Sequence, residues 1–497
     1  MQLKQLLPQM TTIGVEGSID REIAGISYDS RRITPGMIFV AIPGHHLDGH
    51  NFIANAVERG ASAVICERNG FVPNRATKIK VTDTRVALAL AADAFYNHPS
   101  AKLKVVGVTG TNGKTTVAFM VKHLFESSGL PAGLIGTVRY EIGERVIPAQ
   151  RTTPEALEVH QMMAQMLRAG CGACVMEVSS HALDQKRVAN VEFDLGIFTN
   201  LTQDHLDYHR TMENYYAAKK KLFTGLQHGA KAGHAVINLD DPYGARLAHE
   251  TSAPVQLTYG LTEAANLRAE QIQLDKDGCS FVVRTADQRF TCRLPLIGRH
   301  NIYNALAAVG AGLALGMEVK AIQQALTTLP LVPGRLEKMD CGQPFGVYVD
   351  YAHTDDALRN VLVTLREITS GRILLTSGCG GCRDTGKRPN MGWVAAELAN
   401  FTLITTDNPR KEAPAHIAAQ IAEGYRLVRR DGYHIELDRR RAIEELIRMA
   451  EPGDTVLIAG KGHETYQEFA DTIVPFDDRL YARETLETQG YRVTETE

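Results

Sequence analysis

The chain contains 497 residues, of which 44% are hydrophobic, and carries a formal net charge of −3 with a pI near 6.6. This length predicts two or three domains with a large core, and the balanced charge excludes the basic footprint typical of nucleic-acid-binding proteins. Because no apolar stretch approaches about 18 residues and residues 1–10 lack a signal-peptide pattern, we expect a cytoplasmic protein without membrane insertion.

Apolar runs of strand length alternate with helical patterns along the chain. This alternation predicts α/β domains built on mostly parallel sheets. The segments Asn97-His98-Pro99-Ser100 and Leu329-Pro330-Leu331-Val332-Pro333-Gly334 have the composition of domain linkers. We therefore expect an N-terminal domain at residues 1–100, a central domain at 101–332 and a C-terminal domain at 333–497.

A glycine-rich loop joins the apolar run 103–108 to an amphipathic helical pattern that begins near Val117. Its sequence is Gly110-Thr111-Asn112-Gly113-Lys114-Thr115-Thr116. In this setting backbone N–H groups and the helix N-terminus bind phosphate, Lys114 contacts the terminal phosphates and Thr115 binds Mg²⁺. The loop therefore predicts ATP or GTP binding. It departs from the usual spacing in having Val108 at the position of the first glycine.

Polar clusters follow the predicted strands at their carboxyl ends, where open parallel sheets bind ligands. Thr115 and Glu177 make a plausible Mg²⁺ site, and a second metal set is available at Asp204, His205, Asp207 and His209. No order of residues indicates a nucleophilic triad. A predicted nucleotide site followed by a C-terminal part rich in arginines and carboxylates indicates that ATP activates an acid, which a second substrate then captures. Further clusters lie at 350–353, 379–384, 407–410 and 460–464.

Several ordered motifs together resemble those of the Mur ligases, and the resemblance runs essentially from end to end. It implies a three-domain fold, with a small N-terminal α/β domain for a UDP-sugar, a central P-loop ATPase-type parallel-sheet domain and a C-terminal Rossmann-like domain for an amino acid. It also implies an ATP-dependent acid–amino-acid ligase of peptidoglycan precursor synthesis that uses ATP and Mg²⁺. Besides residues 110–116, the motifs are Glu177-Val178-Ser179-Ser180-His181, Asp204-His205-Leu206-Asp207-Tyr208-His209, His300-Asn301-Ile302-Tyr303-Asn304, Asp350-Tyr351-Ala352-His353 and Ala459-Gly460-Lys461-Gly462-His463-Glu464.

The resemblance implies that a substrate carboxylate attacks the ATP γ-phosphate and that an amine then displaces phosphate from the acyl phosphate. Lys114 and two Mg²⁺ ions would stabilise the developing phosphoryl charge. Lys219 matches the carbamylated lysine of the family, although Lys220 and Lys221 leave its register open. The implied metal ligands are Thr115, Glu177, His205 and Lys219. The implied nucleotide contacts are Gly110 to Thr116 with Asn301, Arg335 and Asp350, and His353 is implied as a nearby catalytic residue.

The implied acid substrate is UDP-N-acetylmuramoyl-L-alanyl-D-glutamate. Arg151 stands where the family has Asn. The residues that match the family's contacts to this substrate are Tyr28, Ser30, His45, His46, Leu47, Thr152, Thr153, Ser179, Gln185 and Arg187.

The run Asp407-Asn408-Pro409-Arg410 resembles the signature of family members that add meso-diaminopimelate. A guanidinium can bind the distal carboxylate of this amino acid in a bidentate manner, whereas a bound lysine would leave Arg410 unpaired. Arg383, Gly460 and Glu464 match the remaining contacts, with Glu464 suited to the distal ammonium. Cys382 stands where the family has Asp.

Three alternatives stay open from the sequence: the same ligase adding L-lysine, a ligase similar to folylpolyglutamate synthetase, and a nucleotide-dependent switch that forms no bond. Arg410 argues against the first, the N-terminal motifs argue against the second, and the set Arg383, Arg410 and Glu464 argues against the third.

Overall fold

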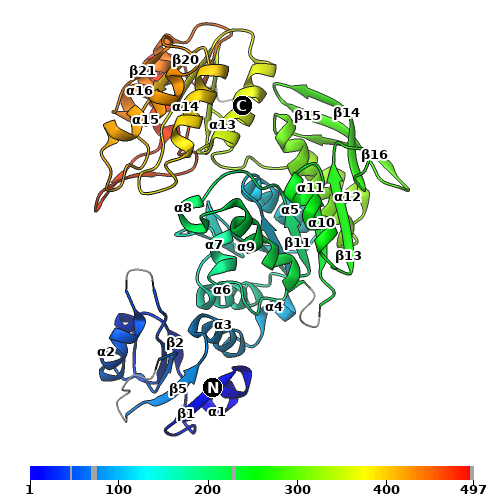
Figure 1. Ribbon diagram of the computed structural model, residues 1–497. Coiled ribbons are helices and arrows are strands. Elements are labelled where there is room, and N and C mark those ends of the chain that lie inside the picture. Colours follow the sequence, from blue (N-terminus) through cyan, green and yellow to red (C-terminus); the bar gives the residue numbers. More distant parts are fainter. Residues whose placement is uncertain (45–46, 69–74, 227–230, 493–497) are drawn as a thin grey trace.

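The computed structural model describes residues 1–44, 47–68, 75–226 and 231–492. Three large sheets follow one another along the chain, and Figure 1 shows them stacked from the N-terminal part at the bottom to the C-terminal part at the top. Parallel pairing dominates each sheet, which confirms the predicted α/β class. None of the described helices has both the length and the apolar character needed to cross a bilayer.

The N-terminal sheet has five strands in the order β1-β5-β4-β3-β2, and only β1 runs antiparallel to its neighbour. One core packs the sheet against α3, and Ala156 and Leu157 of the following domain join that core. The strands are β1 (Thr12–Glu16), β2 (Gly25–Ser27), β3 (Met37–Val40), β4 (Ala63–Cys66) and β5 (Thr77–Val81), and the helices are α1 (Leu3–Leu6), α2 (Ile53–Glu58) and α3 (Thr84–Phe95).

The central sheet has eleven strands in the order β16-β15-β14-β13-β12-β11-β6-β10-β7-β8-β9. Its parallel middle is flanked by the antiparallel strands β8 and β9 on one side and β15 and β16 on the other. The parallel strands are β6 (Lys104–Thr109), β7 (Ala132–Ile135), β10 (Ala173–Glu177), β11 (Leu195–Phe198), β12 (His234–Asn238), β13 (Val255–Gly260) and β14 (Leu267–Asp275). The edge strands are β8 (Arg139–Ile142), β9 (Arg145–Pro148), β15 (Gly278–Arg284) and β16 (Arg289–Leu294).

Helices cover both faces of the central sheet, so its strands are continuously apolar. Val106 and Val108 pack into the core with α5 and α11, whereas Val105 belongs to the core with α6 and α9. This split follows from the alternation of side chains along a strand. The helices are α4 (Pro99–Lys102), α5 (Lys114–Ser127), α6 (Ala156–Arg168), α7 (Ser180–Asp184), α8 (Leu206–His209), α9 (Met212–Gly225), α10 (Pro242–Glu250), α11 (Arg299–Ala314) and α12 (Val319–Thr327).

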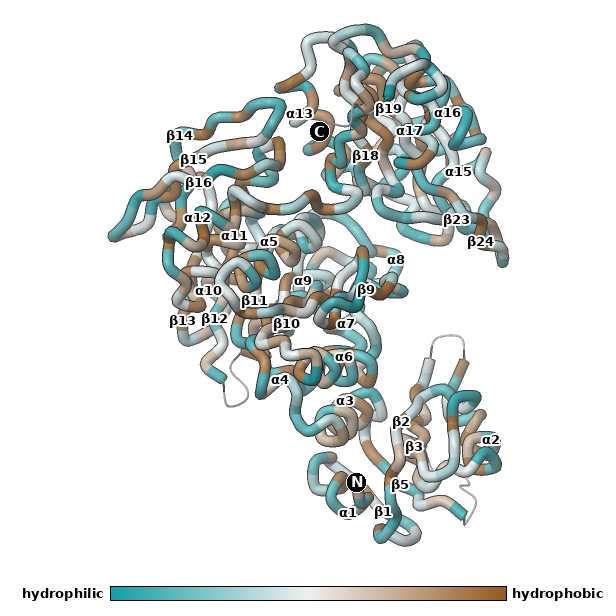
Figure 2. Tube along the Cα trace, turned by 180° about the vertical axis from the view of Figure 1, so that it is seen from behind, coloured by the Kyte–Doolittle hydropathy of each residue, from teal (hydrophilic) through white to brown (hydrophobic). Residues whose placement is uncertain are grey.

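The C-terminal sheet has six strands in the order β17-β18-β22-β19-β20-β21, and a separate hairpin pairs β23 with β24. Figure 2 shows hydrophobic segments concentrated around β19, inside the helical cover. The strands are β17 (Glu337–Lys338), β18 (Gly346–Asp350), β19 (Ile373–Ser377), β20 (Phe401–Ile404), β21 (Tyr433–Ile435), β22 (Thr455–Ala459), β23 (Tyr466–Phe469) and β24 (Thr472–Pro475). The helices are α13 (Asp355–Ile368), α14 (Lys387–Leu398), α15 (Pro414–Arg426), α16 (Arg439–Met449) and α17 (Asp478–Thr488).

A buried ion pair joins α16, α17 and the end of β22. Arg439 Nε and Nη2 donate to the two carboxylate oxygens of Asp478 at 2.8 and 2.7 Å, and both side chains are 0% exposed. Arg439 Nη2 also donates to the carbonyl of Ala459 at 2.9 Å. This pair therefore fixes the chain at the start of the segment 460–464.

We expect Asp478→Ala to lower the free energy of unfolding by about 3–5 kcal/mol, because it leaves the Arg439 charge buried and unpaired. Urea unfolding followed by the fluorescence of Trp393, the single tryptophan of the chain, measures the change within the same domain. Glu444→Ala, which removes exposed pairs with Arg440 and Arg448 on α16, is the matched control and should cost much less. Equal losses for the two variants would contradict this role of the buried pair.

Candidate active site

The glycine loop lies between β6 and the first residue of α5, as the sequence predicts. Val108, at the position of the motif's first glycine, is a buried residue of β6 that is in register with Glu177 and Ile197. Gly110 has a φ of 150°, and a Cβ at this position would lie 1.8 Å from Thr199 Oγ1. Glycine is therefore required at position 110, where Thr199 after β11 approaches closely. Position 108 needs no glycine, because Val108 is an ordinary residue of the strand β6.

Lys114 folds back over this loop. Its Nζ donates to the carbonyls of Gly110 and Thr111 at 2.9 and 2.8 Å. Burial lowers the pKa of Lys114, although the carboxylates of Glu177 and Asp204 oppose that shift. The ammonium and the N-terminus of α5 together form a site for an anion.

Thr115 and Glu177 form a cluster of hard oxygen ligands beside the loop. Thr115 Oγ1 donates to Glu177 Oε2 at 3.0 Å, and Thr137 donates to the same carboxylate through its N–H and its hydroxyl at 2.8 and 2.9 Å. Arg335 Nη2 donates to Thr115 Oγ1 at 3.0 Å. These oxygens fit the preference of Mg²⁺, which usually takes one or two protein ligands and completes its shell with phosphate and water.

Lys219 on α9 reaches the same loop from the opposite side. Its Nζ donates to the carbonyl of Gly110 at 2.7 Å, and the residue is only 1% exposed. Burial lowers the pKa of Lys219 far below its usual value, and the neighbouring Lys114 lowers it further. Lys220 and Lys221 instead pair with Glu250 and Asp184. Of the three consecutive lysines, Lys219 therefore faces the loop.

The proposed second metal set does not assemble. Among the described residues no group of three or more His, Cys, Asp or Glu side chains is arranged to bind a metal. The expectation that Asp204, His205, Asp207 and His209 form one site is therefore wrong. The rings of His205 and His209 both pack against His181, with centroids 4.8 and 5.4 Å away, and His209 Nε2 lies 2.9 Å from Ser180 Oγ.

His205 lies beside Asp204, with 3.4 Å between Nε2 and Oδ2. Burial lowers the pKa of His205 to about 3 despite this carboxylate, and burial likewise lowers the pKa of His353 to about 4. Lys387 of the C-terminal domain places its Nζ 3.8 Å from Asp204 Oδ1. Two neutral imidazoles and a cation from another domain thus border the loop.

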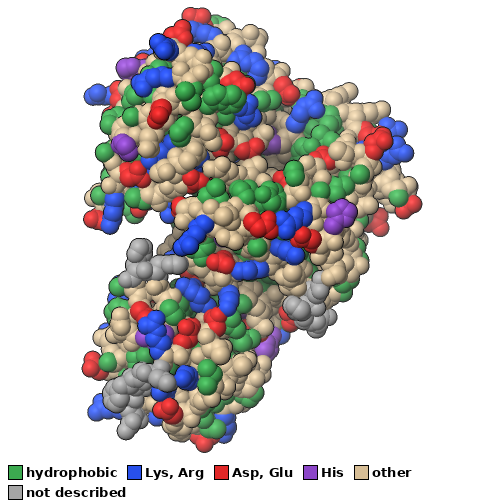
Figure 3. Space-filling view, in the orientation of Figure 1, with side chains coloured by type: hydrophobic (Ala, Val, Ile, Leu, Met, Phe, Trp, Pro, Cys, Tyr) green, Lys and Arg blue, Asp and Glu red, His purple; other side chains and the backbone are tan. Residues whose placement is uncertain are grey.

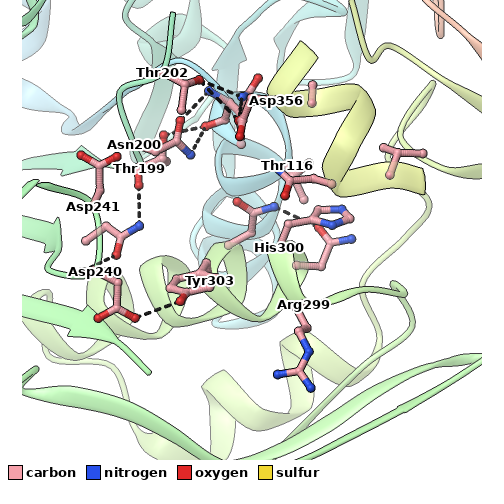
Figure 4. Close-up of a pocket in the computed structure, with 18 of the residues that line it drawn as sticks. Thr116, Thr199, Asn200, Thr202, Asp240, Asp241, Arg299, His300, Tyr303 and Asp356 are labelled. Carbon is pink, nitrogen blue, oxygen red and sulfur yellow. Dashed lines mark hydrogen bonds between the residues drawn. The ribbon is translucent and has the colours of Figure 1, made fainter. Parts of the chain in front are cut away.

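A cavity of about 360 Å³ opens beside the glycine loop, and Figure 4 shows its polar lining. The predicted nucleotide contacts Asn301, Arg335 and Asp350 line this cavity together with Asn112, Gly113 and Thr116. Asp350, however, accepts the backbone N–H groups of Leu336 and Ala352, both at 2.7 Å, so its carboxylate also holds the chain around it.

The cavity also contains residues that motif reasoning missed. Tyr303 donates to Asp240 Oδ2 at 2.9 Å, and Asn112 Nδ2 donates to Asp356 Oδ2 of α13 at 2.7 Å. Tyr303 lies within a quoted motif, but Asp240 and Asp356 carry no local signal. Other lining residues without an assigned role are Asn200, Thr202, Asp241, Arg299 and Asn304.

A second cavity, of about 790 Å³, lies between the N-terminal and central sheets. Tyr28, Ser30 and Leu47 line it as predicted contacts, and so does Arg151. Tyr28 donates to Glu158 at 2.9 Å. The predicted contacts His45 and His46 lie outside the described residues.

A chain of hydrogen bonds leads from this cavity toward Glu177. Arg187 donates to the Thr153 carbonyl at 3.1 Å and to Gln185 Oε1 at 2.7 Å. Thr153 Oγ1 donates to the carbonyl of Glu177 at 2.7 Å and accepts the N–H of Ser179 at 3.1 Å. Thr152 Oγ1 lies 3.1 Å from Thr137 Oγ1, and Thr152 is the donor because Thr137 gives its hydroxyl proton to Glu177. Arg187 Nε also lies 3.1 Å from Oε1 of Glu155, which lines the second cavity, so these predicted acid-substrate contacts run from the border of that cavity to Glu177.

In the C-terminal domain, a buried polar cluster contains Asn408, Lys461 and Glu464. Lys461 Nζ donates to Asn408 Oδ1 at 3.1 Å and to Glu464 Oε2 at 2.9 Å, and Asn408 Nδ2 donates to Glu464 Oε2 at 2.9 Å. Burial raises the pKa of Glu464. Gly460 has a φ of 117°, and a Cβ there would lie 3.0 Å from Asp407 Oδ2.

Arg410 is not unpaired in this site. Its Nη1 donates to the carbonyl of Gly381 at 2.9 Å, and its Nε lies 2.8 Å from Glu468 Oε2. The argument that lysine would leave Arg410 without a partner is therefore wrong.

The predicted contact Arg383 is exposed to solvent. The N–H of the neighbouring Cys382 donates to Glu412, whose carboxylate also accepts from the buried Arg388. The loops after β19 and β20 are thus tied together, and Pro409 lies at their contact.

Three successive segments of the chain match models of known protein families. Residues 22–96 match the family described as "Mur ligase family, catalytic domain", 108–312 match "Mur ligase middle domain" and 334–462 match "Mur ligase, glutamate ligase domain".

The chain is similar to proteins named UDP-N-acetylmuramoyl-L-alanyl-D-glutamate--2,6-diaminopimelate ligase. The protein from Syntrophomonas wolfei is 45% identical and the alignment covers 98% of this chain and 99% of the relative. The one from Solibacter usitatus is 46% identical over 95% of each chain.

Solved structures show the same fold. A structure titled with that ligase name matches with a TM-score of 0.70, 31% identity and 99% coverage of both chains. A folylpolyglutamate synthase from Mycobacterium tuberculosis, at 17% identity, matches with a TM-score of 0.62 and covers 76% of this chain and 92% of its own. At that identity the second likeness concerns the fold alone.

Because Lys114 supplies the cation over the loop, Lys114→Met should weaken the binding of Mg·ATP by at least about tenfold. A ligand at a hundred times its Kd stabilises a protein by about 2.7 kcal/mol, so thermal unfolding with and without Mg·ATP measures the loss. The control Lys320→Met removes an exposed lysine from α12. A ligand-induced rise in Tm that is as large in Lys114→Met as in the unsubstituted protein would contradict the phosphate role.

Proposed function

The chain belongs to the Mur ligase family, and on that premise we propose that it is an ATP-dependent ligase. It would join meso-diaminopimelate to UDP-N-acetylmuramoyl-L-alanyl-D-glutamate, the reaction in the names of its relatives. The observation that carries this proposal is the glycine loop with the buried Thr115–Glu177 pair, which Arg335 and Asp356 of the C-terminal region contact directly. Figure 3 shows the surface indented between the C-terminal and N-terminal parts, with basic side chains along its lower border.

The reaction begins when an oxygen of the substrate carboxylate bonds to the γ-phosphorus of ATP and the bond to ADP breaks. Lys114 and the N-terminus of α5 would stabilise the developing phosphoryl charge, and Arg335, which donates to Thr115, would lie near the same phosphates. Thr115 and Glu177 would hold Mg²⁺, which supplies charge neutralisation at the phosphates.

In the second step the amine nitrogen bonds to the acyl carbon, phosphate leaves and the nitrogen loses a proton. His205 and His353 are neutral at pH 7, because burial lowers the pKa of each to about 3 and about 4. They would act as hydrogen-bonding groups rather than as cations around the acyl phosphate. The amine would come from the side of Glu464 and Arg410, so the amide forms between the domains.

Lys219 would carry a carbamate. Carbamylation joins the neutral amine to CO₂ and releases a proton, and burial lowers the pKa of Lys219, which shifts the balance toward the neutral amine. The product is an anion beside two cations, Lys114 and any bound metal, where an ammonium would be repelled. Its oxygens would add a ligand of the type that Mg²⁺ prefers.

The C-terminal cluster supports diaminopimelate as the amine substrate. Its distal centre carries one carboxylate and one ammonium, and the cluster offers Arg410 and Glu464 as complementary groups. L-Lysine lacks the carboxylate, and its ammonium would add a second cation near Arg410. The preference therefore depends on charge complementarity.

Phosphate release should require ATP, Mg²⁺, the UDP-linked dipeptide and meso-diaminopimelate together. Replacement of diaminopimelate by L-lysine should lower kcat/KM by at least about a hundredfold, because a site built for a polar group rejects an analogue that lacks it. Equal turnover with lysine would contradict the role given to Arg410. Phosphate release without either acceptor would contradict a ligase.

Lys219→Ala should lower kcat by at least about a hundredfold, because a charged group that acts on the phosphates is lost. Lys220→Ala, its neighbour in an exposed pair with Glu250, is the matched control and should keep near-normal turnover. Mass spectrometry of the intact chain prepared in bicarbonate should show the carbamate only where Lys219 is present. Comparable activity in the two variants would argue against the assignment.

A further inference from the structure

The β23–β24 hairpin lies against the loop that carries Arg410 and binds it as an added strand. The N–H of Arg410 donates to the Glu468 carbonyl at 3.0 Å, and the N–H of Ala470 donates to the Arg410 carbonyl at 2.6 Å. The N–H of Glu468 donates to Asn408 Oδ1 at 3.1 Å. Both Asn408 and Arg410 therefore depend on the hairpin for their positions.

The side chain of Gln467 strengthens this attachment. It is 7% exposed, and its Nε2 donates to the carbonyls of Thr406 and Asp407 at 3.2 and 3.0 Å. Arg410 itself has a φ of 52°, a left-handed conformation that is uncommon for a residue other than glycine. Such a conformation persists where surrounding contacts over-determine it, and the hairpin supplies those contacts.

Glu468 also controls the guanidinium of Arg410. Its Oε2 lies 2.8 Å from Arg410 Nε, while Arg410 Nη1 donates to the carbonyl of Gly381 at 2.9 Å. Within the described part of the chain, Arg410 Nη2 donates no hydrogen bond. The side chains of Arg410 and Glu468 are 20% and 33% exposed, so the pair borders solvent rather than the core.

We propose that Glu468 is a positioning residue for selection of the amino acid, an inference that rests on the proposed ligase function. It occupies the Nε side of Arg410 and leaves Nη2 to bind the distal carboxylate of the incoming amino acid. A planar guanidinium held at two of its three nitrogens loses less freedom when it binds a carboxylate. The pair also neutralises Arg410 before substrate arrives, which limits the desolvation cost of the free site.

Glu468 therefore contributes to selection of the amino acid although it does not touch the substrate. When Glu468 is removed, Arg410 regains rotational freedom and binds the distal carboxylate less well, whereas ATP and the UDP-linked substrate bind elsewhere. The expected signature is a change confined to the amino acid, which a general loss of structure would not produce.

Glu468→Gln, which keeps the side-chain volume, and Glu468→Ala test this role. With saturating ATP, Mg²⁺ and UDP-linked dipeptide, each should raise KM for meso-diaminopimelate by about tenfold, the size expected for a coupled, partly exposed pair. The kcat and the KM for ATP should stay within about twofold of the unsubstituted values. Asp471→Ala, in the exposed turn of the same hairpin, is the matched control and should change neither constant.

The Arg410→Ala background separates positioning from a structural effect. There Glu468→Gln should cause no further rise in KM, because the group that it orients is gone. An unchanged KM in Glu468→Gln, or an equal rise in the Arg410→Ala background, would overturn the inference. If Arg410→Ala is too slow to measure, the constants of Glu468→Gln alone decide. A raised KM for meso-diaminopimelate with an unchanged kcat supports positioning, and a fall in kcat of the same size overturns it. Failure of the unsubstituted protein to turn over diaminopimelate would instead contradict the proposed function.

Discussion

The carbonyl of Gly110 accepts hydrogen bonds from two buried lysines, Lys114 at 2.9 Å and Lys219 at 2.7 Å. Two ammonium groups cannot share one acceptor in a low-dielectric site without strong repulsion. Burial and the proximity of Lys114 therefore favour a neutral Lys219. The site therefore suits a ligand that brings phosphate charge beside Lys114 and a lysine that becomes an anion.

The other parts of the site are arranged around that loop by contacts between domains. Arg335 reaches Thr115 at 3.0 Å, Asp356 accepts from Asn112 at 2.7 Å and Lys387 lies 3.8 Å from Asp204. Each contact joins a residue of the C-terminal region to the loop or to a strand end of the central sheet. A movement of the C-terminal domain would therefore change the nucleotide cavity and the amino-acid site together, as expected where domain closure assembles a catalytic site.

The sequence was sufficient to predict the α/β class and the strand–loop–helix unit, because these depend on local apolar patterns and glycine spacing. It could not separate Lys219 from Lys220 and Lys221, since that choice depends on how α9 is rotated against β6. It wrongly grouped Asp207 and His209 with His205, because His209 Nε2 lies beside Ser180 Oγ at 2.9 Å and no set of three ligands assembles among the described residues. It also missed Glu468, whose contact with Arg410 exists only because a distant hairpin folds against the loop.

The central claim is that the substrate carboxylate itself attacks ATP, and oxygen transfer tests it most directly. UDP-linked dipeptide labelled with ¹⁸O in the reacting carboxylate would be turned over with ATP and meso-diaminopimelate, and the released phosphate examined by ³¹P NMR. An acyl phosphate predicts one labelled oxygen in each phosphate, because the carboxylate oxygen leaves with phosphorus when the amide forms. Unlabelled phosphate at full turnover would contradict the account, since water rather than the carboxylate would then have attacked the nucleotide.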